Sequence, residues 1–107
     1  MGFFGQMAKE LNLIIANTDF RTTANPPYAV YFVESENNIY ADGIIVYSEK
    51  EVSFYLYHTK DDKLTEVSVE NYLSKKGITF EKENDWVQDD QLIETLYTIN
   101  FKKSEVL

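Results

Sequence analysis

His58 is the only histidine in the sequence, and histidine is the residue type best suited to acid–base chemistry near neutral pH. The chain has no cysteine, so no second histidine or cysteine could share a metal ion with His58, and no thiolate nucleophile exists. Nor does the sequence suggest a nucleophile and an orienting partner of the catalytic-triad kind. We interpret His58 as an ordinary surface histidine at a strand end, with general-base catalysis as the alternative.

A second group with chemical potential is an acidic stretch near the C-terminus, in which Lys82 is the only base. Its acids are Glu81, Glu83, Asp85, Asp89, Asp90 and Glu94. Carboxylates are ligands for calcium and magnesium, but the calcium-loop spacing fails because no glycine follows Glu83-Asn84-Asp85. The stretch is interpreted as a solvated surface, with an acidic docking patch and then a metal site as the alternatives.

Composition excludes further classes of function. The glycines at positions 2, 5, 43 and 77 form no phosphate-binding loop, so we predict no enzymatic activity and no cofactor. The net charge is −8 and Arg21 is the only arginine, so broad nucleic-acid binding, which depends on Lys and Arg, is not expected. No apolar run is long enough to cross a bilayer, and we expect a soluble protein made in a cytoplasm.

Hydrophobic periodicity predicts the elements of the first half of the chain. An amphipathic helix is expected over residues 3–15, because Phe3, Phe4, Met7, Ala8, Leu11, Ile14 and Ile15 share one face. A long polar connection containing two prolines follows over 17–27. Strands are predicted over 28–34, 44–47 and 52–57, with turns at 35–38 and 48–51 and a bend at Gly43.

The second half is predicted to contain one helix and two strands. The helix is expected to begin with Thr59 as its N-cap, to bury Leu64, Val69, Tyr72 and Leu73, and to end at Lys75-Lys76-Gly77. Strands follow over 78–83 and 92–102, and residues 103–107 form a frayed tail. The prediction is a single α+β domain over residues 1–107, with the order αβββαββ. Its antiparallel sheet of about five strands has two helices on one face.

Four stretches together resemble a known family. They are PYAVYF (residues 27–32), NNIYADGIIVYSEKEVSFYLYHTKDD (37–62), LSKKGITFEK (73–82) and WVQDDQLIETLYTINF (86–101). The chain is similar over these stretches to the minor capsid proteins of tailed bacteriophages that belong to the tail-completion or tail-terminator (head–tail joining) group. The Tyr40-Ala41-Asp42 step, the entry to the second helix, and the aromatic-acid-acid approach to the last strand carry the likeness.

The resemblance implies a virion structural protein without catalytic activity. Subunits of this family form a ring, typically of six, that caps the head-proximal end of the tail tube and docks to the head connector. The implied partners are therefore other copies of the chain, the tail-tube protein and the head connector proteins. The implied location is the tail or neck of the virion, with the host bacterial cytoplasm as the place of assembly.

Several residues are candidates for the subunit interfaces. Phe20 and Arg21 lie in the long connection, and Ile44 and Ile45 are consecutive, so that one of the two is expected on an uncovered face. The remaining candidates are Trp86, whose alternative role is packing at a hairpin end, and the acids Asp89 and Asp90. The competing hypothesis is a monomeric acidic binding module, for example an inhibitor that mimics the charge of DNA.

Overall fold

The computed structural model describes residues 2–17, 25–87 and 92–102. Within them the elements follow in the order α1 (Phe3–Leu11), β1 (Ile14–Asn17), β2 (Tyr28–Ala41), β3 (Ile44–Thr59), α2 (Lys63–Lys75), β4 (Thr79–Val87) and β5 (Leu92–Lys102). The predicted α+β class and the order αβββαββ are confirmed. No helix among these residues is long and apolar enough to cross a membrane.

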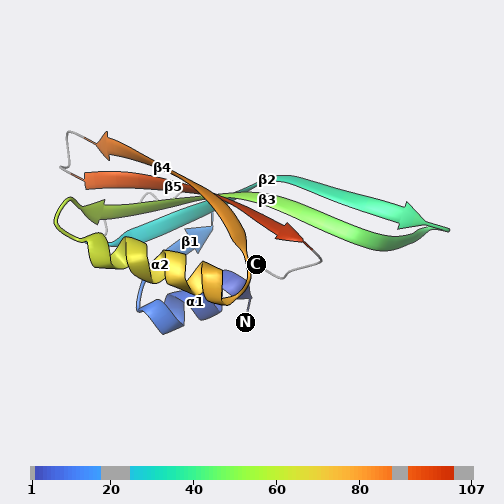
Figure 1. Cartoon of the computed structure of the whole chain (residues 1–107), viewed down its shortest axis with the longest axis horizontal. Coiled ribbons are helices and arrows are strands. Elements are labelled where there is room, and N and C mark those ends of the chain that lie inside the picture. Colours follow the sequence, from blue (N-terminus) through green and yellow to red (C-terminus); the bar gives the residue numbers. More distant parts are fainter. Residues whose placement is uncertain (1, 18–24, 88–91, 103–107) are drawn as a thin grey trace.

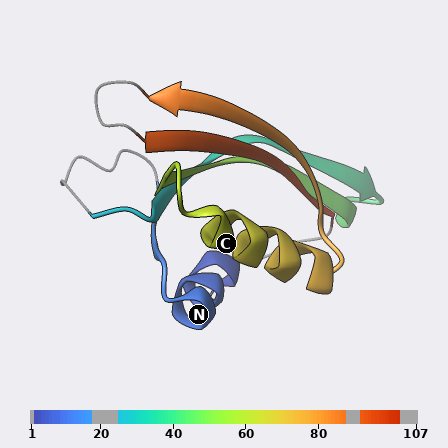
Figure 2. The same ribbon diagram turned by 60° about the vertical axis from the view of Figure 1, so that its left-hand side comes forward.

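The strands form one sheet in the order β1-β2-β3-β5-β4, with β3 at its centre. Three of the four strand pairs are antiparallel, but β1 runs parallel to β2, so the sheet is mixed. Both helices pack against the same face of this sheet and leave the other face without a helix (Figures 1 and 2). The fold therefore has two layers, with the core between the sheet and the helices.

The core is built by strict alternation along the central strand. Val52, Phe54 and Leu56 are fully buried on the helix side, as the period of two in β3 predicts. From α1, Phe4 stacks on Phe54 with ring centroids 5.4 Å apart, and Phe3 packs edge-on against Phe101 of β5 at 5.1 Å. Such aromatic pairs stabilise the docking of α1 on the sheet by more than the burial of their apolar area alone.

The first helix is shorter than the sequence predicts. It ends at Leu11 because Asn12 adopts the left-handed conformation, with φ of 52°, which asparagine tolerates better than most residues. Leu13, which does not fit the apolar face of the predicted helix, is buried after the helix end. Residues 14–17, predicted as helix, instead form β1 and pair with residues 28–31 of β2.

The predicted turns at 35–38 and 48–51 are also wrong, because both segments lie inside strands. β2 and β3 pair along their whole length, from Tyr28 opposite Tyr57 to Ala41 opposite Ile44. The reversal is the two-residue loop Asp42-Gly43, with φ of 53° and 78°, and Asp-Gly is a favoured sequence for a turn with two positive φ angles. Polar residues can occupy both faces of this ribbon because water surrounds it.

The second helix begins later than predicted. Thr59 is the last residue of β3, and Asp62 is the N-cap, its carboxylate accepting from the Thr65 N–H at 3.2 Å. Val69, Tyr72 and Leu73 are buried as predicted, but Leu64 is exposed. Lys75 ends the helix as predicted, and Gly77 follows with a φ of 72°.

We predict that Tyr72→Phe leaves the free energy of unfolding unchanged or raises it by up to about 1 kcal/mol. The Tyr72 hydroxyl is buried and has no hydrogen-bond partner among the described residues, so its removal abolishes only a desolvation penalty. The matched control is Tyr97→Phe, which loses a 2.9 Å hydrogen bond to Glu70 and should cost about 1.5 kcal/mol. Urea unfolding measures both, and a larger loss for Tyr72→Phe than for Tyr97→Phe would contradict this account.

Candidate functional site: an exposed hairpin arm and a buried polar network

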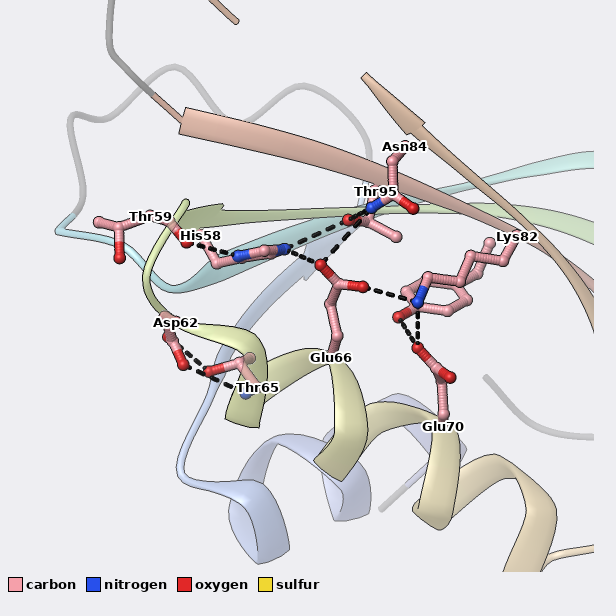
Figure 3. A network of polar contacts seen from close by, with 10 residues as sticks. His58, Thr59, Asp62, Thr65, Glu66, Glu70, Lys82, Asn84 and Thr95 are labelled. Carbon is pink, nitrogen blue, oxygen red and sulfur yellow. Dashed lines mark hydrogen bonds and ion pairs between the residues drawn. The ribbon is translucent and has the colours of Figure 1, made fainter. Parts of the chain in front are cut away.

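A network of polar side chains lies between α2 and the sheet (Figure 3). Glu66 is at its centre: its carboxylate lies 2.5 Å from Nε2 of His58 and 2.7 Å from Nζ of Lys82. Lys82 also pairs with Glu70 at 2.7 Å. Asn84 and Thr95 complete the network, since the Asn84 amide donates to Thr95 Oγ1 at 2.8 Å.

Secondary-structure periodicity brings these residues together. Glu66 and Glu70 are four residues apart, so they lie on the same side of α2. Lys82 and Asn84 alternate onto the helix side of β4, because Lys82 is opposite the buried Tyr97. His58 is on the same face of β3 as Leu56, at the end of the strand that leads into α2.

The geometry fixes a proton between His58 and Glu66. Nδ1 of His58 lies 2.8 Å from the carbonyl oxygen of Thr59, and since a carbonyl can only accept, Nδ1 carries a hydrogen. A hydrogen bond from Nε2 to the carboxylate needs a second proton, shared by the pair. With that shared proton the His58–Glu66 pair has no net charge, and the charge of Lys82 balances that of Glu70.

These contacts change the acidity of the network residues. Burial by itself would raise the pKa of Glu66, but the hydrogen bond from Lys82 and the charge of His58 outweigh it and hold that pKa below the usual value. Partial burial alone would lower the pKa of Lys82, but its hydrogen bonds to Glu66 and Glu70 raise it. Burial, and then the hydrogen bond to Glu70, raise the pKa of Tyr97.

The centre of the network is enclosed, whereas Lys82, Glu70 and Asn84 reach the surface. His58 is 0% exposed and Glu66 is 4% exposed, so the interpretation of His58 as a surface histidine is wrong. The sequence places His58 beside polar residues, and only the docking of α2 over the strand end buries it. The buried imidazole of His58 links the end of β3 to Glu66 and so helps to hold α2 against the sheet.

Within the described part of the chain, no group of three or more histidine or acidic side chains could hold a metal ion. Glu81 and Glu83 are exposed on the face of β4 opposite Lys82, in agreement with a solvated surface. Asp89 and Asp90 lie outside the described residues, as does the side chain of Asp85.

The most exposed apolar side chains of the sheet gather on a projecting hairpin. Beyond the ends of β1 and β5, residues 35–48 form a two-stranded ribbon, which we call the arm (Figure 1). At its tip Ile39 is 56% exposed, Tyr40 60% and Ile44 67%. The arm gives the molecule its elongated shape, with principal extents of 52 × 26 × 24 Å.

The sheet face without helices carries a row of aromatic side chains, which we call the open face. Val30 is buried on this face, and the other members are half-buried. The face consists of Tyr28, Val30, Phe32, Tyr55, Tyr57 and Leu96. Tyr28 stacks on Tyr57 at 5.1 Å, and Phe32 packs edge-on against Tyr55 at 5.9 Å. The Tyr57 hydroxyl donates to Glu94 at 2.8 Å; burial and this hydrogen bond raise the pKa of Tyr57.

The predicted interface residues separate into three groups. Ile44 lies at the arm tip, and Ile45 follows it in β3, though its side chain is outside the described set. Trp86 lies in β4 opposite Ile93, and its side chain is likewise not described. Phe20, Arg21, Asp89 and Asp90 fall outside the described residues.

Sequence reasoning missed Ile39, Tyr40 and the His58–Glu66 pair. Ile39 and Tyr40 precede the predicted strand 44–47, and the Asp42-Gly43 sequence is the signal that would place them at a hairpin tip. Glu66 lies three residues before Val69, so it shares the buried stripe of α2 with an apolar residue. A buried acid at that position requires a cation, which the inward-facing Lys82 supplies.

Comparison of the sequence with protein-family models and with curated proteins finds no match.

We predict that Glu66→Gln lowers the free energy of unfolding by about 3 kcal/mol, because it breaks a buried charge network and leaves His58 and Lys82 with one anion fewer. Glu81→Gln is the matched control, since it removes the same charge from an exposed position and should cost less than about 0.5 kcal/mol. Urea denaturation followed by circular dichroism measures both. Equal losses in the two variants would contradict the central position of Glu66.

The Glu66 contribution should also depend on pH. Because its pKa is lowered in the folded state, its stabilising effect is complete above the ordinary glutamate pKa of about 4.3 and is lost as the pH falls through the lower folded value. The stability difference between wild type and Glu66→Gln should therefore shrink as the pH is lowered from about 6 to about 3. A difference that stays constant over this range would show that the carboxylate charge contributes nothing.

Proposed function

We propose that this protein is a structural subunit of a tailed-bacteriophage virion. In this proposal, copies of the chain form a ring at the head-proximal end of the tail, which ends the tail tube and joins it to the head. The sequence resemblance to tail-completion and tail-terminator proteins supplies the biological setting. The observation that carries the proposal is the arm, a projection whose tip exposes the apolar side chains of Ile39, Tyr40 and Ile44.

The arm supports self-association for an energetic reason. Exposed apolar side chains such as Ile39 and Ile44 gain free energy when a partner covers them, at roughly 25 cal/mol per Å² of apolar surface. A two-stranded hairpin is also only marginally stable alone in water, whereas contact with another surface stabilises it. An extended hairpin of this length is therefore well suited to bridge neighbouring subunits.

The polar network supports a function by contact rather than by catalysis. The one histidine is enclosed and serves to hold α2 on the sheet, so the most prominent chemistry of the chain is directed inward. The tail-tube protein and the head connector proteins are the further partners that we propose. Exposed carboxylates such as Glu81 and Glu83 suit docking to basic patches on them.

We predict that the purified protein self-associates reversibly and that moderate salt favours this. Subunits of charge −8 repel one another, and at about 0.15 M salt the screening length falls to about 8 Å. Sedimentation over a wide concentration range, with and without tail-tube protein, measures the effect. In the parent phage, Ile44→Lys should produce filled heads without tails, or tails of irregular length.

Leu64→Lys is the control for that variant, because it adds the same charge at an exposed apolar residue on α2, away from the arm. It should leave association and tail assembly unchanged. A strict monomer under all conditions, with no binding to tube ends, would refute the ring and favour a monomeric acidic module.

A further inference from the structure

The arm is left uncovered by its own subunit. β1 pairs with β2 only as far as Tyr31, and β5 pairs with β3 only from Glu49 onward, so residues 35–48 have no third strand among the described residues. The arm continues the two central strands of the sheet and projects away from it (Figure 1). Register shifts at Val33/Ser35 and Ile39/Tyr40 twist the ribbon but do not fold it back over the sheet.

The arm differs from the rest of the chain in charge. Within the arm, Glu36 and Asp42 are the only charged residues and none lies between Gly43 and Ser48, although charged residues make up 26% of the sequence. Two subunits of net charge −8 can approach each other most closely where charge is sparse. A basic partner would instead require several carboxylates along the contact, so the sparsely charged arm favours a second copy of the same chain over a cationic protein.

The open face offers an apolar surface that could receive the arm of another subunit. Its rings shield Val30, which is buried although no helix covers this side of the sheet. The face presents half-buried aromatic surface from Phe32, Tyr55 and Tyr57. Its acids lie around this surface: Glu49 and Glu51 at the end of β3 that leads into the arm, and Glu81, Glu83 and Glu94 on the β4 and β5 side. The uncharged segment 43–48 of an arm can lie on the aromatic part of the face without placing two carboxylates together.

We propose that the arm of one subunit lies across the open face of the next copy. This inference rests on the proposed self-association and names its contact. The β2 side of the arm, residues 35–41, spans about 20 Å at roughly 3.3 Å per residue, comparable with the 24 and 26 Å shorter extents of one subunit. The arm is therefore long enough to cross most of a neighbour's sheet.

The contact is one-directional. Each subunit offers an arm on one side and receives an arm on its open face, so the two patches differ. Contacts of this kind propagate from copy to copy and close into a ring when the rotation allows it, whereas a contact between two identical patches stops at a dimer. The inference thus accounts for two apolar surfaces with one interface.

Cross-linking tests the contact directly, since the chain has no native cysteine. Tyr40→Cys places a thiol at the arm tip, and Thr98→Cys places one on the open face between Glu81 and Ser53. A mixture of these two variants, treated with a short bismaleimide, should yield a covalent dimer. Mixing Tyr40→Cys with Val67→Cys, an exposed position on α2, should yield none.

Complementation provides a second, independent measurement. Ile44→Lys damages the arm and Tyr55→Lys damages the open face, so each variant alone should lose association at least about tenfold, the effect of uncovering one large apolar side chain. A mixture of the two retains one intact arm and one intact face. It should therefore form a dimer that grows no further, which sedimentation detects.

The outcomes separate this inference from the proposed function. Cross-linking of Tyr40→Cys with itself, or association by Tyr55→Lys alone at wild-type strength, would show that arms pair with arms and would overturn the contact. Association that survives Ile44→Lys and gives no Tyr40–Thr98 product would also overturn it, while leaving the ring proposal intact. A wild-type protein that stays monomeric would refute both.

Discussion

The register of β3 is the constraint on which the rest of the structure depends. This strand is paired on both sides, with β2 from Ile44 to Tyr57 and with β5 from Glu49 to Thr59. The same alternation buries Val52, Phe54 and Leu56 under the helices and turns Tyr55 and Tyr57 to the open face. A slip of one residue would expose the core side chains and move His58 away from Glu66, so register, core and network are specified together.

The network adds a directional requirement that the hydrophobic core lacks. Apolar packing of Val69 and Leu73 alone would tolerate small rotations or shifts of α2. The carboxylate of Glu66, in contrast, must lie within contact distance of both His58 and Lys82. Buried ion pairs contribute little net stability relative to apolar residues, because desolvation offsets their attraction. Their effect here is to select one placement of α2, which in turn fixes β4 through Lys82 and Asn84.

The fold was predictable from the sequence wherever a periodic pattern coincided with burial. The alternation in β3 and β5 and the Lys75–Gly77 helix end are local signals, and the structure agrees with them. Two features are not local. Residues 14–17 continue an apolar helical pattern, and only pairing with residues 28–31, together with the left-handed Asn12, makes them a strand. His58 continues the buried alternation of Phe54 and Leu56, but it stands at the end of the strand, and a helix that begins after it completes its burial.

The edge strand β4 and the arm differ in charge. Along β4, Glu81, Lys82 and Glu83 are consecutive charges, and charged side chains on an edge prevent pairing with other chains. The arm strand Ile44–Ser48 has β-branched and aromatic residues and no charge, a composition that promotes association when it is left exposed. The proposed association therefore uses the arm and not the edge strand β4. The arm projects from the sheet, where a partner can reach it without approaching the acidic surface of β4.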